Sequence, residues 1–148
     1  AIATGAKGTF IDSVGKKVNA VNAIIKKLQL DRAAAVHTRI EEYAAQNRGL
    51  FDIVVARALA SMPILIEYAA PFLCEHGHLV ISKGNPEDNE LSSAQDAASI
   101  CGLKLVQNDS FDLPSGLGHR EIFIFERVSN PSISLPRPNG MARKNPLV

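Results

Sequence analysis

A strand–helix–strand pattern between residues 51 and 84 constrains the fold of this chain more than any other feature. Residues 51–56 form a short apolar run, typical of a parallel strand that is buried on both faces. Ser61 then offers a helix N-cap with Pro63 in the first turn, and a second apolar run, Leu79–Ile81, follows Gly77. This order and spacing predict two parallel strands joined by a crossover helix.

Elements of the same two kinds alternate along the rest of the chain. Strands are predicted at residues 8–12, 33–38, 103–106 and 121–127, and helices around residues 18–28, 41–47 and 90–100. The loop between the last two strands is rich in Pro, Gly and Ser and leaves no room for a crossover helix, so these strands should be antiparallel. We therefore expect an α/β doubly wound sheet with a terminal antiparallel strand pair, an ending that is usual among class I methyltransferases.

The composition suits one domain with a substantial core, because 46% of the 148 residues are hydrophobic. The last twenty residues contain four prolines, three basic residues and no acidic residue, whereas the remainder has 13 basic and 15 acidic residues. We expect a domain at residues 1–128 and a basic, Pro-rich C-terminal tail at residues 129–148. This charge distribution permits a nucleic-acid partner without requiring one.

No sequence signal predicts a membrane span, a secretory signal peptide or a disulfide framework. No apolar run approaches the roughly 20 residues of a spanning helix. Cys74 and Cys101 lie far apart and form no CxxC pair. The expected location is therefore cytoplasmic.

Two local groupings suggest other chemistries, and each lacks a necessary part. Cys74, His76 and His78 have the spacing of metal ligands on one strand face, but zinc sites usually draw a second ligand pair from elsewhere, and His119 is the only remote candidate. Asp109-Ser110 and His119 supply the residue types of a Ser–His–Asp triad, but the G-x-S-x-G nucleophile elbow is absent. We expect neither a metal site nor a serine hydrolase.

Acidic residues follow two of the predicted strands, at the carboxyl edge where open α/β sheets bind ligands. Asp12 suits hydrogen bonds from both hydroxyls of a ribose, and it equally suits a helix N-terminus with Lys16 as its partner. Glu41 or Glu42 could bind an adenine amino group, although such pairs are common as solvated residues at the start of a helix. The GxGxxG signature of nicotinamide-dinucleotide enzymes is absent.

Basic residues occupy two further strand ends. Arg57 lies where the strand at residues 51–56 gives way to its helix, in an apolar setting where an unpaired guanidinium would be costly. It should therefore meet an anionic ligand or form a structural pair with Glu41 or Asp12. Lys83-Gly84 follows the next strand and suits either a phosphate or a polar turn.

With these residues in place, the chain resembles the glucose-inhibited division protein B family. Members of this family are bacterial methyltransferases that modify N7 of a guanine in small-subunit ribosomal RNA. Each matching motif is weak alone, but the set is specific in this order: Phe10-Ile-Asp-Ser13, Lys16-Lys17, His37-Thr-Arg-Ile-Glu-Glu42, Phe51-Asp-Ile-Val-Val-Ala-Arg-Ala-Leu-Ala-Ser61, Ile81-Ser-Lys-Gly84, Arg120, Pro136-Arg-Pro-Asn-Gly140 and Lys144-Asn-Pro-Leu147.

The resemblance implies that S-adenosylmethionine binds at three strand ends, through Asp12, Ser13, Val14, Ile40, Glu41 and Arg57. The first three would hold the ribose, the next two would contact the adenine, and Arg57 would line the pocket near the reacting groups. The implied partner is 16S rRNA or the small ribosomal subunit. The basic residues expected to contact RNA are Lys16, Lys17, Lys83, Arg120, Arg137, Arg143 and Lys144.

The implied reaction needs no general base, because guanine N7 carries an in-plane lone pair and the sulfonium is an activated donor. We therefore name no catalytic residue. The family's first strand and Gly-rich loop would lie before Ala1 and are expected to be missing here, with residues 1–3 as the last turn of the following helix. We expect this chain alone to bind S-adenosylmethionine poorly. The alternatives are an inactive or RNA-binding-only fragment and a different Rossmann-like nucleotide enzyme.

Overall fold

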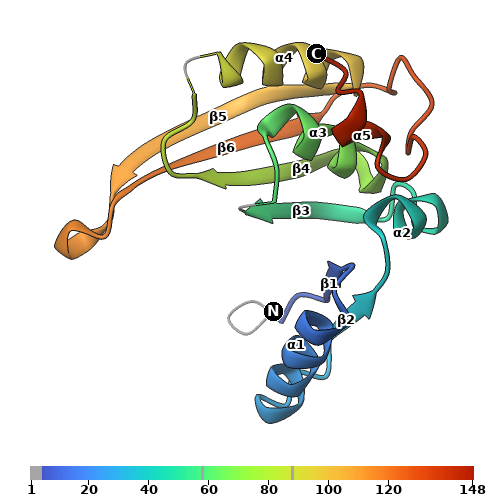
Figure 1. Ribbon diagram of the computed structural model, residues 1–148, viewed down its shortest axis with the longest axis vertical. Helices are drawn as coiled ribbons and strands as arrows, with labels where there is room; N and C mark the ends of the chain where they lie inside the picture. Colours follow the sequence, from blue (N-terminus) through green and yellow to red (C-terminus); the bar gives the residue numbers. More distant parts are fainter. Residues whose placement is uncertain (1–4, 58, 88) are drawn as a thin grey trace. The chain divides into compact units, whose positions relative to one another are not determined.

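The structure is a computed structural model of the 148-residue chain and describes residues 5–57, 59–87 and 89–148 (Figure 1). The chain divides into two compact units, Ala1–Tyr43 (unit 1) and Ala44–Val148 (unit 2), and the boundary falls within helix α2 (Ile40–Gln46). The helical turn expected at residues 1–3 lies outside the described residues. No helix in the described part of the chain is both long and apolar enough to span a membrane.

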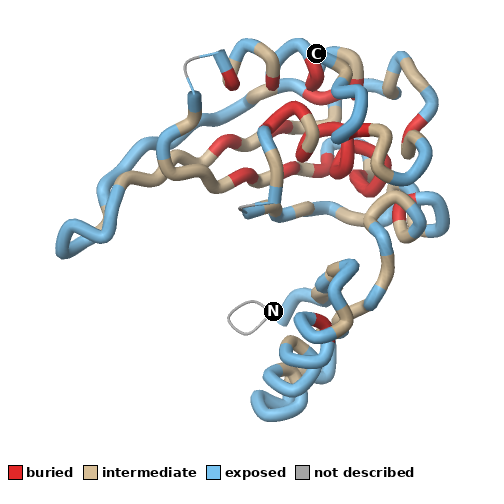
Figure 2. Tube along the Cα trace, in the orientation of Figure 1, coloured by how far each residue is buried: buried red, intermediate tan, exposed pale blue. Residues whose placement is uncertain are grey.

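Unit 1 contains a two-stranded parallel sheet and its crossover helix. Strand β1 (Gly8–Asp12) pairs with β2 (Ala33–His37), and α1 (Gly15–Lys27) connects them. The two strands and the helix predicted in this part of the sequence are confirmed. Among its described residues, Val18 is the only hydrophobic residue that is buried. Figure 2 shows the contrast with unit 2, where most buried residues lie. Unit 1 therefore has only a small hydrophobic core among its described residues.

Unit 2 is built on a four-stranded mixed sheet in the order β3-β4-β6-β5. Strands β3 (Phe51–Arg57) and β4 (Leu73–Lys83) are parallel and are joined by α3 (Met62–Ala69), as the opening sequence pattern predicts. The predicted burial of β3 on both faces is wrong, because β3 is an edge strand of this sheet and Ile53 and Val55 are 60% and 71% exposed. Strand β6 (His119–Arg127) runs antiparallel to both β4 and β5 (Leu103–Asp112). The predicted antiparallel ending is confirmed.

The core of unit 2 lies between this sheet and the helices α3 and α4 (Glu90–Ile100), as Figures 1 and 2 show. Side chains alternate along a strand, so one face of the two central strands is buried against the helices. The fully buried strand residues are Leu79, Ile81, Phe123 and Phe125. This packing fixes the carboxyl ends of β3 and β4 beside each other.

The last two strands are longer than predicted and replace most of the expected loop. Strand β5 continues to Asp112 and β6 begins at His119, so that only a short 3-10 turn, Pro114–Gly116, lies between them. The extension projects as a two-stranded ribbon in Figure 1, and residues 106–112 are exposed. Backbone pairing rather than apolar burial holds these residues, so the sequence shows no apolar strand pattern there.

Residues 129–148 pack onto the rest of unit 2. Leu135 and Ala142, the latter in the short helix α5 (Met141–Lys144), are each only 3% exposed. The backbone N–H and the hydroxyl of Ser132 both donate to the carbonyl oxygen of Ile100, at 2.9 and 3.1 Å. In the structure this segment belongs to the same compact unit as the sheet. The domain boundary proposed at residue 128 remains a prediction.

Candidate functional site

Asp12 ends β1, and its carboxylate organises the turn into α1. Oδ1 accepts a hydrogen bond from the backbone N–H of Val14 at 2.8 Å, and Oδ2 lies 3.5 Å from Nζ of Lys17. The partner considered from the sequence was Lys16, one residue earlier. A carboxylate offers about four lone-pair directions. Because the side chain is 35% exposed, these two contacts leave capacity for a ligand hydroxyl.

His37 is a site residue that the sequence-based prediction omitted. It pairs in register with Asp12, and its Nε2 lies 3.1 Å from the carbonyl oxygen of Ser13. A Cβ added to Gly15 would lie 3.4 Å from Cε1 of His37, so the glycine lets α1 start close against the ring. The backbone N–H of Thr38 also donates to the Asp12 carbonyl, at 3.2 Å. The available signal was the position of His37 at the strand end, just before Ile40 and Glu41.

The start of α2 follows directly from the carboxyl end of β2. Ile40 and Glu41 open this helix, and both are half-buried. Unit 1 therefore places five of the six predicted cofactor residues at or just after the carboxyl ends of two paired strands. These five are Asp12, Ser13, Val14, Ile40 and Glu41.

Arg57, the sixth predicted residue, belongs to unit 2. It is the last residue of β3, where it is exposed and in register with Ser82 of β4. Its position at the carboxyl end of a parallel strand is the one that the sequence predicted. That edge is where ligands bind in open α/β sheets.

Lys83, at the end of β4, is engaged in a structural ion pair. Its Nζ lies 2.6 Å from Oε1 of Glu90, and the two side chains are 21% and 9% exposed. The same carboxylate oxygen accepts the backbone N–H of Met62 at 2.8 Å. Ser61 occupies the predicted N-cap position of α3 but makes no side-chain capping bond, so Glu90 supplies that acceptor instead. Of the two roles considered for Lys83, these contacts favour the structural one.

The structure brings together Ser110 and His119, with Asp112 as the acid in place of Asp109. Ser110 Oγ lies 3.1 Å from His119 Nε2, and His119 Nδ1 lies 2.9 Å from Asp112 Oδ1. Both contacts follow from the β5–β6 pairing, which places Asp112 opposite His119 and Ser110 opposite Glu121. Asp112 is 87% exposed, so this group is a solvated set of cross-strand neighbours. In the described part of the chain, no group of three or more His, Cys, Asp or Glu side chains is placed to hold a metal ion.

The sequence matches the family model described as rRNA small subunit methyltransferase G over residues 1–120. The chain belongs to this family. A relative from Brevibacillus brevis named ribosomal RNA small subunit methyltransferase G is 37% identical over 144 residues, covering 96% of this chain and 60% of the relative. A relative of the same name from Desulfitobacterium hafniense is 33% identical over 141 residues, covering 94% and 59%. The chain thus spans about 60% of the length of these methyltransferase G relatives.

Solved structures of methyltransferases have a similar fold. The 1,6-didemethyltoxoflavin-N1-methyltransferase of Burkholderia thailandensis, solved with S-adenosylhomocysteine, aligns with a TM-score of 0.65 at 12% identity, covering 86% of this chain and 64% of that one. The N-methyltransferase NodS of Bradyrhizobium japonicum, also solved with S-adenosylhomocysteine, gives 0.60 at 16% identity, covering 82% and 66%. The predicted α/β fold of class I methyltransferases is confirmed.

Proposed function

We propose that this chain is the methyl-transferring domain of an enzyme that uses S-adenosylmethionine to methylate N7 of a guanine in 16S rRNA. The observation that carries the proposal is the family match over residues 1–120. The arrangement of β1, β2 and α2 supports it, because their predicted cofactor residues share one carboxyl edge. Membership of the methyltransferase G family favours this function over an inactive fragment.

In this proposal the carboxyl edge of unit 1 holds the nucleoside part of S-adenosylmethionine. Asp12 accepts hydrogen bonds from the ribose hydroxyls, beside the backbone of Ser13 and Val14. Ile40 packs against the adenine and Glu41 accepts its amino group. His37 is a positioning residue, since its contact with the Ser13 carbonyl fixes the turn that carries Asp12.

The proposed reaction requires no ionisable side chain as a general base. Bound S-adenosylmethionine supplies a methyl group activated by its sulfonium. Guanine N7 attacks with its own lone pair and loses no proton, so the chain provides orientation and exclusion of water rather than a base. Arg57, exposed at the end of β3, is proposed to orient the reacting groups through its fixed fork of N–H donors.

The structure narrows the proposed RNA contacts. Lys83 is paired with Glu90, and Arg137 is paired with Glu67, so these two side chains serve the fold. Arg143 donates through Nη2 to the Leu59 carbonyl oxygen at 3.0 Å. The exposed basic residues of the predicted set that remain available are Lys16 and Lys144, whereas Lys17 is exposed but its Nζ lies 3.5 Å from Oδ2 of Asp12. The half-buried Arg120 lies at the start of β6.

The product identifies the reaction most directly. A chimaera is made in which this chain replaces the matching 144 residues of the Brevibacillus brevis relative. It is incubated with 16S rRNA or small ribosomal subunits and methyl-labelled S-adenosylmethionine, and the digested nucleosides are separated. We expect label in 7-methylguanosine, and a much lower rate for Arg57→Ala than for the control Lys104→Ala. Label in another nucleoside, or none in a chimaera that folds, contradicts the proposal.

A further inference from the structure

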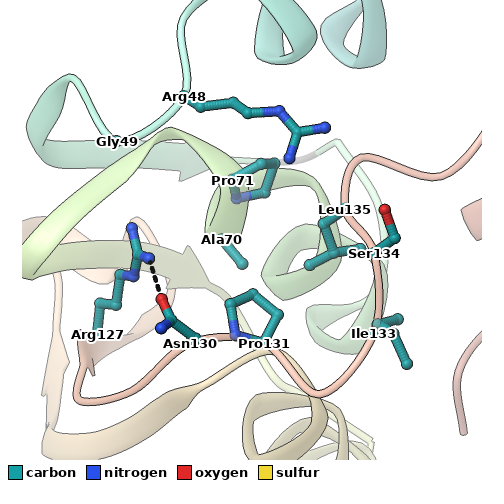
Figure 3. Close-up of a pocket in the computed structure, with 10 residues that line it drawn as sticks. All are labelled: Arg48, Gly49, Ala70, Pro71, Arg127, Asn130, Pro131, Ile133, Ser134 and Leu135. Atoms are coloured by element: carbon teal, nitrogen blue, oxygen red, sulfur yellow. Dashed lines mark hydrogen bonds between the residues drawn. The ribbon is translucent and has the colours of Figure 1, made fainter.

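Unit 2 contains a pocket at the amino ends of its parallel strands, the opposite end of the sheet from Arg57. Its volume is about 380 Å³. Gly49 comes just before β3, Pro71 just before β4, and Arg127 ends the antiparallel strand β6. The segment after β6 closes the pocket with Asn130 and its neighbours, as Figure 3 shows. A volume of this order is typical of small-ligand sites.

The charge lining this pocket is entirely positive. Arg48 and Arg127 are the only charged residues among those that line it. Neither arginine forms an ion pair in the described part of the chain. Glu75 lines an adjoining pocket of about 260 Å³ that also includes Arg127, so an anion in the first pocket meets one negative charge nearby.

Arg127 is held in place before any ligand arrives. Its half-buried guanidinium donates through Nη1 to the carbonyl oxygen of Leu73 and through Nη2 to Oδ1 of Asn130 at 3.0 Å, the bond drawn in Figure 3. A guanidinium has five N–H donors, so three remain after these two bonds. A partly buried cation with neutral partners only is stabilised further by an anion.

The second cation and the apolar walls complete the site. Arg48 is exposed and lies in the turn between α2 and β3. The half-buried Pro131 and Ile133 supply apolar surface, and Ser134 supplies a hydroxyl. Two guanidinium groups suit the oxygens of a phosphate, and the apolar surface suits a sugar attached to it.

We propose that Arg48 and Arg127 form a phosphate-binding site at the amino edge of this sheet. The phosphate is carried by the backbone of an RNA strand or is free in solution, since both present the same oxygens. The RNA source rests on the proposed function, whereas phosphate binding itself does not. The site is separate from the edge where Arg57 lies, so binding here leaves that strand end accessible.

The test is a titration of the 148-residue chain, without S-adenosylmethionine, with inorganic phosphate and with a short fluorescein-labelled single-stranded RNA. Arg48→Ala is the decisive variant, because Arg48 is exposed and its loss leaves the hydrogen bonds of Arg127 intact. Lys104→Ala is the control, since it removes one exposed positive charge from unit 2 outside the pocket. Circular dichroism verifies that each variant is folded.

We expect Arg48→Ala to weaken phosphate or RNA binding about tenfold, and Lys104→Ala to change it less than about twofold. For an RNA source, the slope of log K against log salt also falls by about 0.7 in Arg48→Ala. If Arg48→Ala weakens binding of inorganic phosphate but not of the RNA, the ligand of this site is free phosphate. If Arg48→Ala changes neither titration, or if Lys104→Ala changes both equally, the site is disproved. Because no methyl transfer is measured, either result leaves the methyltransferase proposal to its own test.

Discussion

Arg137 stabilises the fold of unit 2, although the sequence suggested that this side chain contacts RNA. Arg137 donates through Nε to Glu67 Oε1 at 2.7 Å, and the two side chains are 17% and 4% exposed. The tail is thereby anchored to α3. Burial raises the pKa of the nearby Cys101 thiol to about 12, and the Glu67 carboxylate adds to that shift. Cys101 is therefore an unreactive core residue.

Removal of Arg137 should destabilise the protein strongly. Arg137→Ala leaves the Glu67 carboxylate buried without its cation, and such changes cost about 3–5 kcal/mol in the free energy of unfolding. Lys144→Ala, an exposed basic residue of the same tail, should cost less than about 0.5 kcal/mol. Urea unfolding compares the two. Equal, small effects would show that the Arg137–Glu67 pair does not hold the tail.

Because of Glu90, the free energy of unfolding should depend on pH in the acid range. Burial alone would raise the pKa of Glu90, but hydrogen bonds from Lys83 and from the Met62 backbone N–H more than offset this, so the pKa lies below its usual value of 4.5. A lowered folded-state pKa stabilises the protein above the usual pKa, and this contribution is lost as the pH falls through the folded-state value.

Glu90→Gln should therefore cost about 1.5–3 kcal/mol near pH 7, and the difference from the parent should shrink as the pH falls below about 4.5. Urea unfolding over this pH range measures the difference. Glu87→Gln, which changes an exposed acid just before α4, is the control and should show no such convergence. A difference that grows in acid would mean that Glu90 is not held ionised by these partners.

At the scale of elements, the sequence predicted correctly the helices and strands whose position is determined by a local pattern of apolar residues. The apolar runs predicted β3, β4 and their crossover helix. The carboxyl-edge rule predicted Asp12 and Arg57 at strand ends and Glu41 after a strand, and in the structure Glu41 lies in the helix that follows β2. The extension of β5 and β6 was missed because it depends on backbone pairing between polar residues. His37 was missed because its contact with Ser13 arises only from the β1–β2 register.

The packing of residues 129–148 also could not be predicted from local sequence patterns, because it depends on contacts between residues that are distant in sequence. Gly102 shows this most sharply, since it has a φ of +75° and an added Cβ would lie 2.4 Å from the carbonyl oxygen of Ser129. The Gly102 carbonyl oxygen accepts the backbone N–H groups of Val128 and Ser129. The turn after α4 thus fits the start of the tail closely.

A single core substitution tests whether the tail is part of the fold. Leu135→Ala should cost about 2–5 kcal/mol of unfolding free energy, because Leu135 is 3% exposed within the core cluster. The same substitution at Leu117, which is 70% exposed in the β5–β6 turn, should cost less than about 0.5 kcal/mol. Thermal or urea unfolding gives both values. Equal stabilities would mean that the tail contributes little to the core.

At the scale of the whole molecule, the two units differ in how much core they contain. Unit 2 has a cluster of buried residues from its sheet, two helices and its tail, whereas Val18 is the only described hydrophobic residue buried in unit 1. Local stability follows buried apolar contact. The unit that carries five of the six proposed cofactor residues is therefore the one with less internal support.

Hydrogen exchange should show this difference. Backbone amides of β1, β2 and α1 should exchange faster than those of β4 and β6, because the latter lie in the centre of the sheet of unit 2. Peptide-level mass spectrometry follows both regions in one sample. Slower exchange in unit 1 than in the central strands would contradict this ordering.

Calorimetric titration with S-adenosylmethionine measures whether the carboxyl edge of β1 and β2 holds the cofactor. The chimaera with the Brevibacillus brevis relative is titrated beside its Asp12→Ala and Asp31→Ala variants, the second removing an exposed acid just before β2. We expect Asp12→Ala to weaken binding by about 1–3 kcal/mol, because ribose hydrogen bonds are lost, and Asp31→Ala to leave the affinity unchanged. Unchanged affinity in Asp12→Ala, or an equal loss in both variants, would contradict this expectation.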